Sequence, residues 1–180
     1  MFIDKQPGYV ADEMEKKLIL LFVFEKMEFP LTDQSISEII MQNSRWLGYM
    51  EFKNSLYLLT ESKFVVRSRH GAEMLYTLTQ SGRGCIEHFY QKIPASIRED
   101  ITSFAAENRP RFKRKQEFTY NYVKNRDGTW LVTLWIREHL TENLLEINLK
   151  VPTKAEAVRM TQSWRDKAAF VYESIVNSLE

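Results

Sequence analysis

The sequence contains a single cysteine, Cys85, among its 180 residues. One cysteine excludes an internal disulfide framework and predicts a reducing, cytoplasmic location. Long apolar runs are also missing: the longest, residues 18–24, is too short to cross a bilayer, so we expect no membrane partner. The N-terminal residues lack the basic stretch and apolar segment of a signal peptide, which also indicates an intracellular protein.

An excess of charge of one sign is the second thing the chain lacks. Its 25 Lys or Arg residues nearly balance 24 Asp or Glu, and the net charge of +1 does not by itself predict a nucleic-acid partner. Hydrophobic residues are plentiful at 44%. That content suffices for the core of one large domain or two small ones, and it excludes a disordered chain.

Catalytic groupings are missing too. The sequence has no Ser-His-Asp spacing, no phosphate-binding glycine loop and no HExxH motif. Cys85 and His88 share one face of a predicted helix, but no second pair of ligands accompanies them. A half-buried helix pair is therefore favoured over a metal site. We expect no enzyme and no cofactor.

Apolar periodicity predicts an N-terminal domain over residues 1–110. Helical spacing and cap residues predict three helices, at 12–26, within 31–42 and at 50–61. Two strands, "FVVRSR" and "MLYTLT", form a hairpin around Gly71. A fourth helix begins near Thr79 or Ser81, and a fifth follows Pro94 and ends at Asn108 and Pro110. Three helices, a hairpin and a helix are the element order of a winged helix-turn-helix domain.

The stretch "SLYLLTESKFVV...YTLTQSGRG" resembles winged-helix regulators of the MarR and PadR types. The matching residues are Leu56, Leu59, Phe64, Tyr76, Leu78, Thr79 and Gly82. Over nearly its whole length, the chain looks like a little-characterised bacterial winged-helix family of unknown function. That similarity is carried by "FPLT" at Phe29 to Thr32, by "IRED" at Ile97 to Asp100 and by Trp164. It implies a regulatory role and no reaction. Lys63 departs from the pattern, because glycine is usual between the helix and the first strand.

The candidate DNA-binding residues lie on the third helix and on the hairpin. With Phe52, Leu56 and Leu59 facing inward, Lys53, Asn54 and Tyr57 are among the residues left outside, together with Glu51, Ser55 and Leu58. Asn54 suits adenine, and Lys53 suits guanine or a phosphate. Arg67, Arg69 and His70 lie near the tip of the hairpin, where Arg67 and Arg69 share a strand face and suit phosphate or the minor groove.

Residues 111–180 predict a second domain. Alternation over "EFTYNYV", "TWLVTLWIR" and "LLEINLKV" predicts a three-stranded antiparallel meander with one apolar side. Thr153 and Glu156 form a capping box for a long helix that ends near Ser178 and covers that side. The basic run "RPRFKRK" is interpreted as a solvated linker or charged edge strand at the domain boundary, in preference to a phosphate-binding segment. The fold class is α+β.

The favoured function is a homodimeric transcriptional regulator that binds double-stranded DNA. The third helix would enter the major groove, and the wing would contact the backbone or minor groove. One alternative is a protein-interaction module, because Glu51 and Leu58 suit DNA poorly. Another is a sensor whose C-terminal domain binds a small-molecule effector. Tyr120, Tyr122, Trp130, Trp135 and Trp164 are the residues that would line its pocket, but the core of a small α/β unit is the favoured interpretation of this aromatic set. Trp135 and Leu131 share the opposite sheet face and suggest a dimer contact there.

Overall fold

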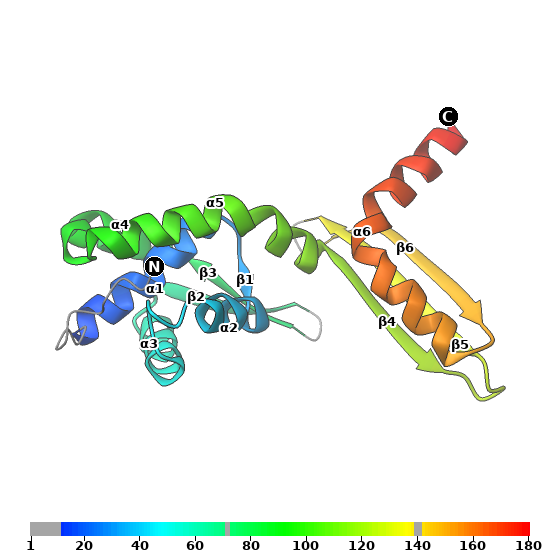
Figure 1. Ribbon diagram of the computed structural model, residues 1–180, viewed down its shortest axis with the longest axis horizontal. Helices are drawn as coiled ribbons and strands as arrows, with labels where there is room; N and C mark the ends of the chain where they lie inside the picture. The colour runs from blue at the N-terminus through cyan, green and yellow to red at the C-terminus, as the bar shows by residue number, and fades with distance from the viewer. Residues whose placement is uncertain (1–11, 71–72, 139–141) are drawn as a thin grey trace, which may run out of the picture. The chain divides into compact units, whose positions relative to one another are not determined.

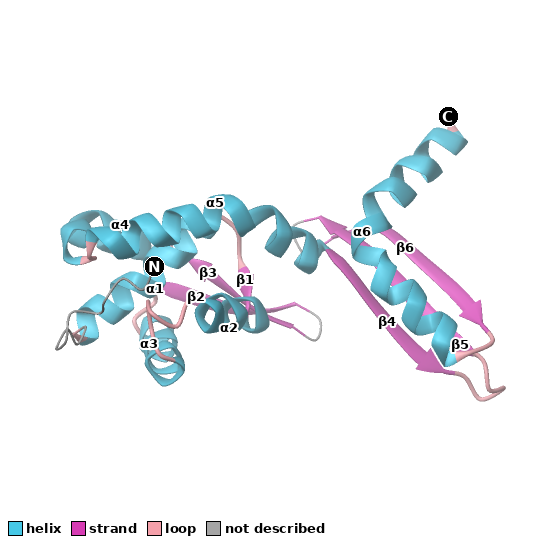
Figure 2. Ribbon diagram, viewed as in Figure 1, coloured by secondary structure: helices cyan, strands magenta, loops and turns pink. Residues whose placement is uncertain are grey.

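The structure is a computed structural model that describes residues 12–70, 73–138 and 142–180. Its elements are mixed helices and strands, with two three-stranded antiparallel sheets and a long C-terminal helix (Figures 1 and 2). Contacts within the chain divide it into two compact units, residues 1–109 and 110–180.

The first unit is built around one buried helix. Its elements are α1 (Glu13–Met27), β1 (Leu31–Thr32), α2 (Asp33–Gln42), α3 (Tyr49–Glu61), β2 (Val65–His70), β3 (Glu73–Leu78), α4 (Gln80–Phe89), a 3₁₀ turn η1 (Tyr90–Lys92) and the first part of α5 (Ala95–Glu117), whose residues from Pro110 on belong to the second unit. Asp12 caps α1 by accepting a hydrogen bond from the Glu15 backbone N–H at 2.7 Å. Every residue from Leu18 to Phe24 is buried, so α1 is covered on all sides and forms the centre of this core.

The first sheet has the order β1-β3-β2, with β3 in the middle. The hairpin predicted from the sequence is present as β2 and β3, but β1 was missed because it is only two residues long. Thr32 has two roles in that short strand. It pairs with Leu75 of β3, and its side chain caps α2 by accepting from the Ser35 backbone N–H at 3.1 Å. Strand and helix therefore meet at one residue.

The end predicted for the fifth helix was wrong. α5 continues through Pro110 to Glu117, and the run "RPRFKRK" is helical instead of a linker or an edge strand. A proline inside a helix costs about 3 kcal/mol, because it removes one hydrogen bond and crowds the preceding turn. The buried stripe of Ile101 and Ala105 nevertheless resumes beyond the proline at Phe112 and Gln116. Burying Phe112 offsets much of that cost.

The second unit is a helix packed on a sheet. Its strands are β4 (Phe118–Lys124), β5 (Trp130–Glu138) and β6 (Glu142–Val151), in the order β4-β5-β6, followed by α6 (Lys154–Leu179). The predicted antiparallel meander is thus confirmed. Gly128 has a φ of 86°, which explains why the turn between β4 and β5 uses glycine.

One face of this second sheet is covered by α6. Val132, Leu134 and Ile136 of β5 are buried with Ala157, Trp164 and Ala168 of α6. The predicted capping box is present: the Thr153 hydroxyl accepts from the Glu156 backbone N–H at 3.2 Å, and the Glu156 carboxylate accepts from the Thr153 backbone N–H at 3.3 Å. No helix among the described residues is long and apolar enough to cross a membrane.

Candidate nucleic-acid interface

The inner face of α3 anchors the predicted DNA-binding helix. Phe52, Leu56 and Leu59 are buried, as expected. Ser55 was expected to face outward but is also buried, at 1% exposure. Each helical residue turns by about 100°, which places position 55 within the stripe formed by the three apolar residues. Ser55 was assigned to the outer face because it is polar, although its position in the helix faces inward.

The outer face of α3 carries Met50, Asn54 and Tyr57. Met50 is 77% exposed and Tyr57 is 62% exposed, while Asn54 is also on the surface. An aromatic ring and an amide on one helix face suit contacts to base edges and sugar in a groove. The Met50 side chain has no hydrogen-bond donor, and its sulfur is only a weak acceptor. The outer face of α3 is therefore partly apolar and partly polar.

The Lys53 side chain is held by a carboxylate. Its Nζ lies 3.1 and 3.2 Å from the two carboxylate oxygens of Asp33, the first residue of α2. The ammonium group also lies 5.0 Å from the centre of the Phe52 ring. Asp33 therefore neutralises Lys53 in the free protein, and a phosphate would have to compete with this carboxylate.

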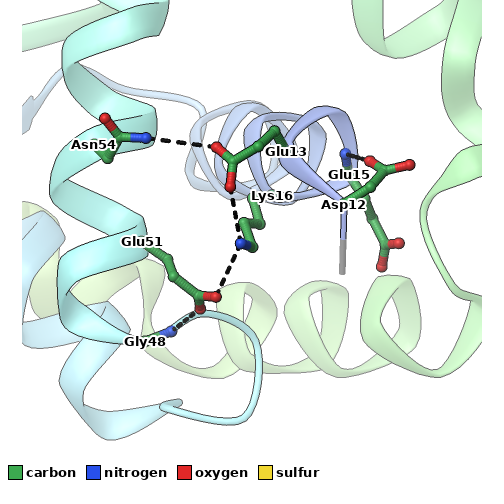
Figure 3. A network of polar contacts seen from close by, with 7 residues as sticks. All are labelled: Asp12, Glu13, Glu15, Lys16, Gly48, Glu51 and Asn54. Atoms are coloured by element: carbon green, nitrogen blue, oxygen red, sulfur yellow. Dashed lines mark hydrogen bonds and ion pairs between the residues drawn. The ribbon is translucent and has the colours of Figure 1, made fainter. Parts of the chain in front are cut away.

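A polar network joins α1 to the start of α3 (Figure 3). Lys16 Nζ lies 2.9 Å from Glu13 Oε1 and 3.1 Å from Glu51 Oε1. Hydrogen bonds to Glu13 and then Glu51 raise the pKa of the Lys16 ammonium. Glu51 also accepts from the Gly48 backbone N–H at 2.8 Å, and Asn54 donates to Glu13 at 3.5 Å.

This network sets the charge at the beginning of α3. Two carboxylates, Glu13 and Glu51, surround the single ammonium group of Lys16. Glu51 already occupies a backbone donor at the N-terminus of the helix, where a phosphate would otherwise bind. The first turn of α3 is therefore the part of the predicted DNA-binding helix least available to a phosphate, and Asn54 and Tyr57 in its middle stay exposed.

The β2–β3 hairpin presents the two candidate arginines. Arg67 pairs with Tyr76 and Arg69 pairs with Met74, and both arginines are exposed. They share one strand face, which by alternation is also the face of the buried Val65 at the base of the hairpin. His70 ends β2, but its side chain lies outside the part of the chain that the structure describes.

The conformation of the turn that joins α3 to β2 explains why glycine is usual at the position of Lys63. This residue has a φ of 64°, a conformation that favours glycine. The Thr79 hydroxyl lies 2.9 Å from the Lys63 carbonyl and 3.0 Å from the Phe64 carbonyl, and it accepts from the Gly82 backbone N–H at 3.1 Å. One threonine therefore joins the start of β2 to the start of α4.

The candidate residues thus fall into two sets, one on α3 and one on the hairpin. The residues that contact α3 around the first set, namely Asp33, Glu13 and Lys16, cannot be recognised as its partners from the sequence. The Lys53–Asp33 pair spans 20 positions and the Asn54–Glu13 pair spans 41. No local pattern predicts such contacts. The one available signal was the acidic first turn of α1 and of α2, which is common at helix starts and does not name a partner.

Two further predictions concern ligands. Among the described residues, no group of three or more His, Cys, Asp or Glu side chains could hold a metal ion. Of the aromatic set proposed as an effector pocket, Trp164 is in the core beside Tyr122 and Trp130. Trp135 lies on the other face of the sheet, where its Nε1 donates to Glu146 at 2.9 Å. These aromatic residues are therefore divided between two faces.

Comparison with known proteins gives a family without an assigned activity. No curated protein and no solved structure matches the chain. A family model matches residues 16–179, which cover most of both units. The chain belongs to the family described as Domain of unknown function (DUF4364).

Proposed function

We propose that this protein is a DNA-binding transcriptional regulator with an N-terminal winged helix-turn-helix domain. In this proposal α3 enters the major groove, and the β2–β3 hairpin is the wing, which contacts the backbone or minor groove. The protein acts as a homodimer, so two copies of α3 contact half-sites about 34 to 36 Å apart. The observation that carries the proposal is the exposed pair Arg67 and Arg69 on a hairpin that directly follows a helix with Asn54 and Tyr57 on its outer face.

Each candidate residue has a distinct role in this proposal. Arg67 and Arg69 neutralise phosphates and thereby release bound counterions. Asn54 donates to and accepts from an adenine edge, and Tyr57 packs against the groove wall. Lys53 contacts a phosphate only after it leaves Asp33, 3.1 Å away. Binding should therefore depend more on the hairpin than on Lys53.

A salt-dependent DNA titration tests the proposal. Fluorescence polarisation with random-sequence duplex compares the wild type with Arg67→Ala/Arg69→Ala from low to moderate salt. Loss of two phosphate contacts should reduce the slope of log K against log salt by about 1.8 units, at 0.9 for each contact. Arg126→Ala/Arg159→Ala in the second unit removes the same charge from exposed positions and serves as the matched control.

Two outcomes would contradict DNA binding through the hairpin. One is the absence of binding at every salt concentration by protein that remains folded. The other is an equal loss in slope for the hairpin pair and the control pair, since that would show a response to total charge alone.

A second candidate is a protein-interaction module that uses the same face of α3. The observation in its favour is the apolar exposure of Met50 and Tyr57 beside carboxylates that already engage Lys16 and Lys53. An exposed apolar patch rimmed by polar groups is typical of a protein contact. Here the partner would supply an apolar side chain to Met50 and Tyr57.

This alternative predicts different effects of substitutions on α3 and on the hairpin. Leu58→Lys or Met50→Lys should abolish capture of a protein partner, while Arg67→Ala/Arg69→Ala leaves that capture unchanged. Unchanged capture by both lysine variants would exclude this face. DNA binding with the salt dependence described above would favour the first proposal.

A further inference from the structure

The apolar stripe of α6 continues beyond its contact with the sheet. Ala157, Thr161, Trp164 and Ala168 are buried in the second unit. The same helical spacing then reaches Val171, which packs partly against this core, and Ile175. Figure 1 shows the last turns of α6 running past the end of the sheet. We call residues 165–179 the α6 tail.

The α6 tail exposes large apolar side chains. Phe170 is 71% exposed and Leu179 is 83% exposed, and Tyr172 and Val176 also reach the surface. Burial of such side chains against an apolar partner removes their surface from water and is favourable. This concentration of exposed apolar surface on one short helical segment indicates a contact surface.

The surface of the α6 tail has both a projecting ring, Phe170, and a hollow that is shallow and widely open to solvent. The hollow has a volume of about 370 Å³ and is lined by Phe170, Val171, Ser174, Ile175, Ser178 and Leu179. The two small residues at its base keep their hydroxyls within the helix: Ser174 donates to the Phe170 carbonyl at 2.7 Å, and Ser178 donates to the Ser174 carbonyl at 2.6 Å. An apolar side chain can fill the hollow without leaving these hydroxyls unpaired.

We propose that the α6 tail binds the α6 tail of a second copy of this chain in an antiparallel pair. With the two-fold axis beside residue 173, Phe170 of each copy lies level with Val176 of the other, between Ser174 and Ser178. Each copy then supplies one projecting ring and one hollow, as a two-fold symmetric interface requires. The inference names the contact for the homodimer of the proposed function, on which it rests, but it does not depend on DNA binding.

The charges and dipoles favour the antiparallel direction. Arg165 and Lys167 lie at the start of the tail, and Glu180 follows its last residue. In the antiparallel pair Lys167 lies near the C-terminal carbonyls of the other α6, where a cation is stabilised. In a parallel pair, Lys167 would lie beside Lys167 of the second copy, which is unfavourable. Glu173 lies level with Glu173 of the second copy in either direction, so this residue does not distinguish the two arrangements.

The opposite face of the sheet is the competing dimer surface. There Trp135 donates to Glu146, Thr133 donates to Asn148 at 2.8 Å, and Asn148 donates to Glu146 at 3.0 Å. Because these polar side chains already form hydrogen bonds with one another, this sheet face needs no partner protein to satisfy them. Between Ala168 and Leu179 the α6 tail carries a single charged residue, Glu173, beside its apolar groups, so it gains more from burial.

Sedimentation velocity over a wide range of protein concentration tests the interface. The tail is about 22 Å long, so the dimer should be weak and should dissociate on dilution. Phe170→Glu should shift the dissociation constant at least tenfold toward monomer, and Val123→Glu on the competing sheet face should leave it unchanged. Circular dichroism checks that both variants keep their helix content. A wild type that stays monomeric throughout, or dissociation by Val123→Glu alone, would overturn the inference.

Disulfide trapping tests the direction of the pair. In a Cys85→Ser background, Ser174→Cys should form an intermolecular disulfide because position 174 lies next to the two-fold axis. Ser178→Cys should not, because the two copies of position 178 are about 15 Å apart along the helices. Trapping at both positions would indicate a parallel pair and contradict the antiparallel arrangement. Wild-type protein that binds DNA as a monomer would refute this contact while leaving DNA binding intact.

Discussion

Replacing Gly82 by alanine provides a direct test of how α4 packs on the start of β2. A Cβ atom at Gly82 would lie 2.4 Å from the Phe64 carbonyl oxygen and 2.6 Å from Leu78 Cδ1. Leu78 can change rotamer, but the carbonyl belongs to the backbone. It accepts from the Thr79 backbone N–H at 3.0 Å and lies 3.0 Å from the Thr79 hydroxyl. The helix must therefore move away from the hairpin.

The expected cost follows from three contributions. Overpacking typically costs about 1 to 3 kcal/mol. Stretching the hydrogen bonds between Thr79 and Phe64 adds about 0.5 to 1.5 kcal/mol. Alanine is a better helix former than glycine by about 1 kcal/mol, which opposes both. We therefore expect Gly82→Ala to lower the free energy of unfolding of the first unit by about 1 to 3 kcal/mol.

Gly84 in the same helix is a matched control. A Cβ atom added there meets nothing within 4 Å. Gly84→Ala should thus stabilise the unit by about 0.5 to 1 kcal/mol through helix propensity and reduced freedom of the unfolded chain. The two substitutions have the same chemistry, lie two positions apart and should have opposite signs.

Cys85 supplies a probe that reports on this unit alone. It is the one cysteine of the chain, and it lies in α4, where burial raises the pKa of its thiol. In pulsed alkylation during a urea titration, the rate at which the Cys85 thiol is modified should rise when the first unit unfolds. The Trp residues of the second unit do not respond to that event. Equal or greater stability of Gly82→Ala than of wild type would refute the close approach of α4 and the Phe64 carbonyl.

Three more changes have defined outcomes. Lys63→Gly relieves a φ of 64° and should raise the free energy of unfolding by about 0.5 kcal/mol, measured by the same alkylation assay; a loss of stability would contradict the left-handed turn. Hydrogen bonds from Lys150 and then Thr129 hold the pKa of Asp127 far below its usual range, so its stabilisation is present above the ordinary pKa of about 3.9 and declines as pH falls below it. The difference in unfolding free energy between wild type and Asp127→Asn should therefore shrink below about pH 4 in urea titrations, and a constant difference would exclude the ion pair as its source. Trp164→Ala should destabilise the second unit by about 3 to 5 kcal/mol in thermal melts, since Trp164 is 3% exposed and donates to the Trp135 carbonyl at 3.2 Å; a cost below 1 kcal/mol would contradict its place in the core.

Local signals predicted much of the fold. Alternation gave the extent and buried face of β5, and the residues Thr32, Thr79 and Thr153 each cap the helix expected after them. These features could be predicted from the sequence because a helix cap or an alternating strand depends only on residues a few positions away. The DNA-binding role assigned to Lys53, Asn54, Tyr57, Arg67, Arg69 and His70 stays a prediction.

Long-range contacts were decided only in the tertiary structure. Ser55 is buried because α3 packs by its whole inner face, and α5 passes Pro110 because a buried stripe resumes at Phe112. Asp33 holds Lys53 from 20 positions away. The sequence alone determined where the helices and the longer strands begin and which side of most of them is apolar, since those properties depend on adjacent residues. The structure decided which charges meet, because a pairing between distant side chains depends on how separate elements pack together.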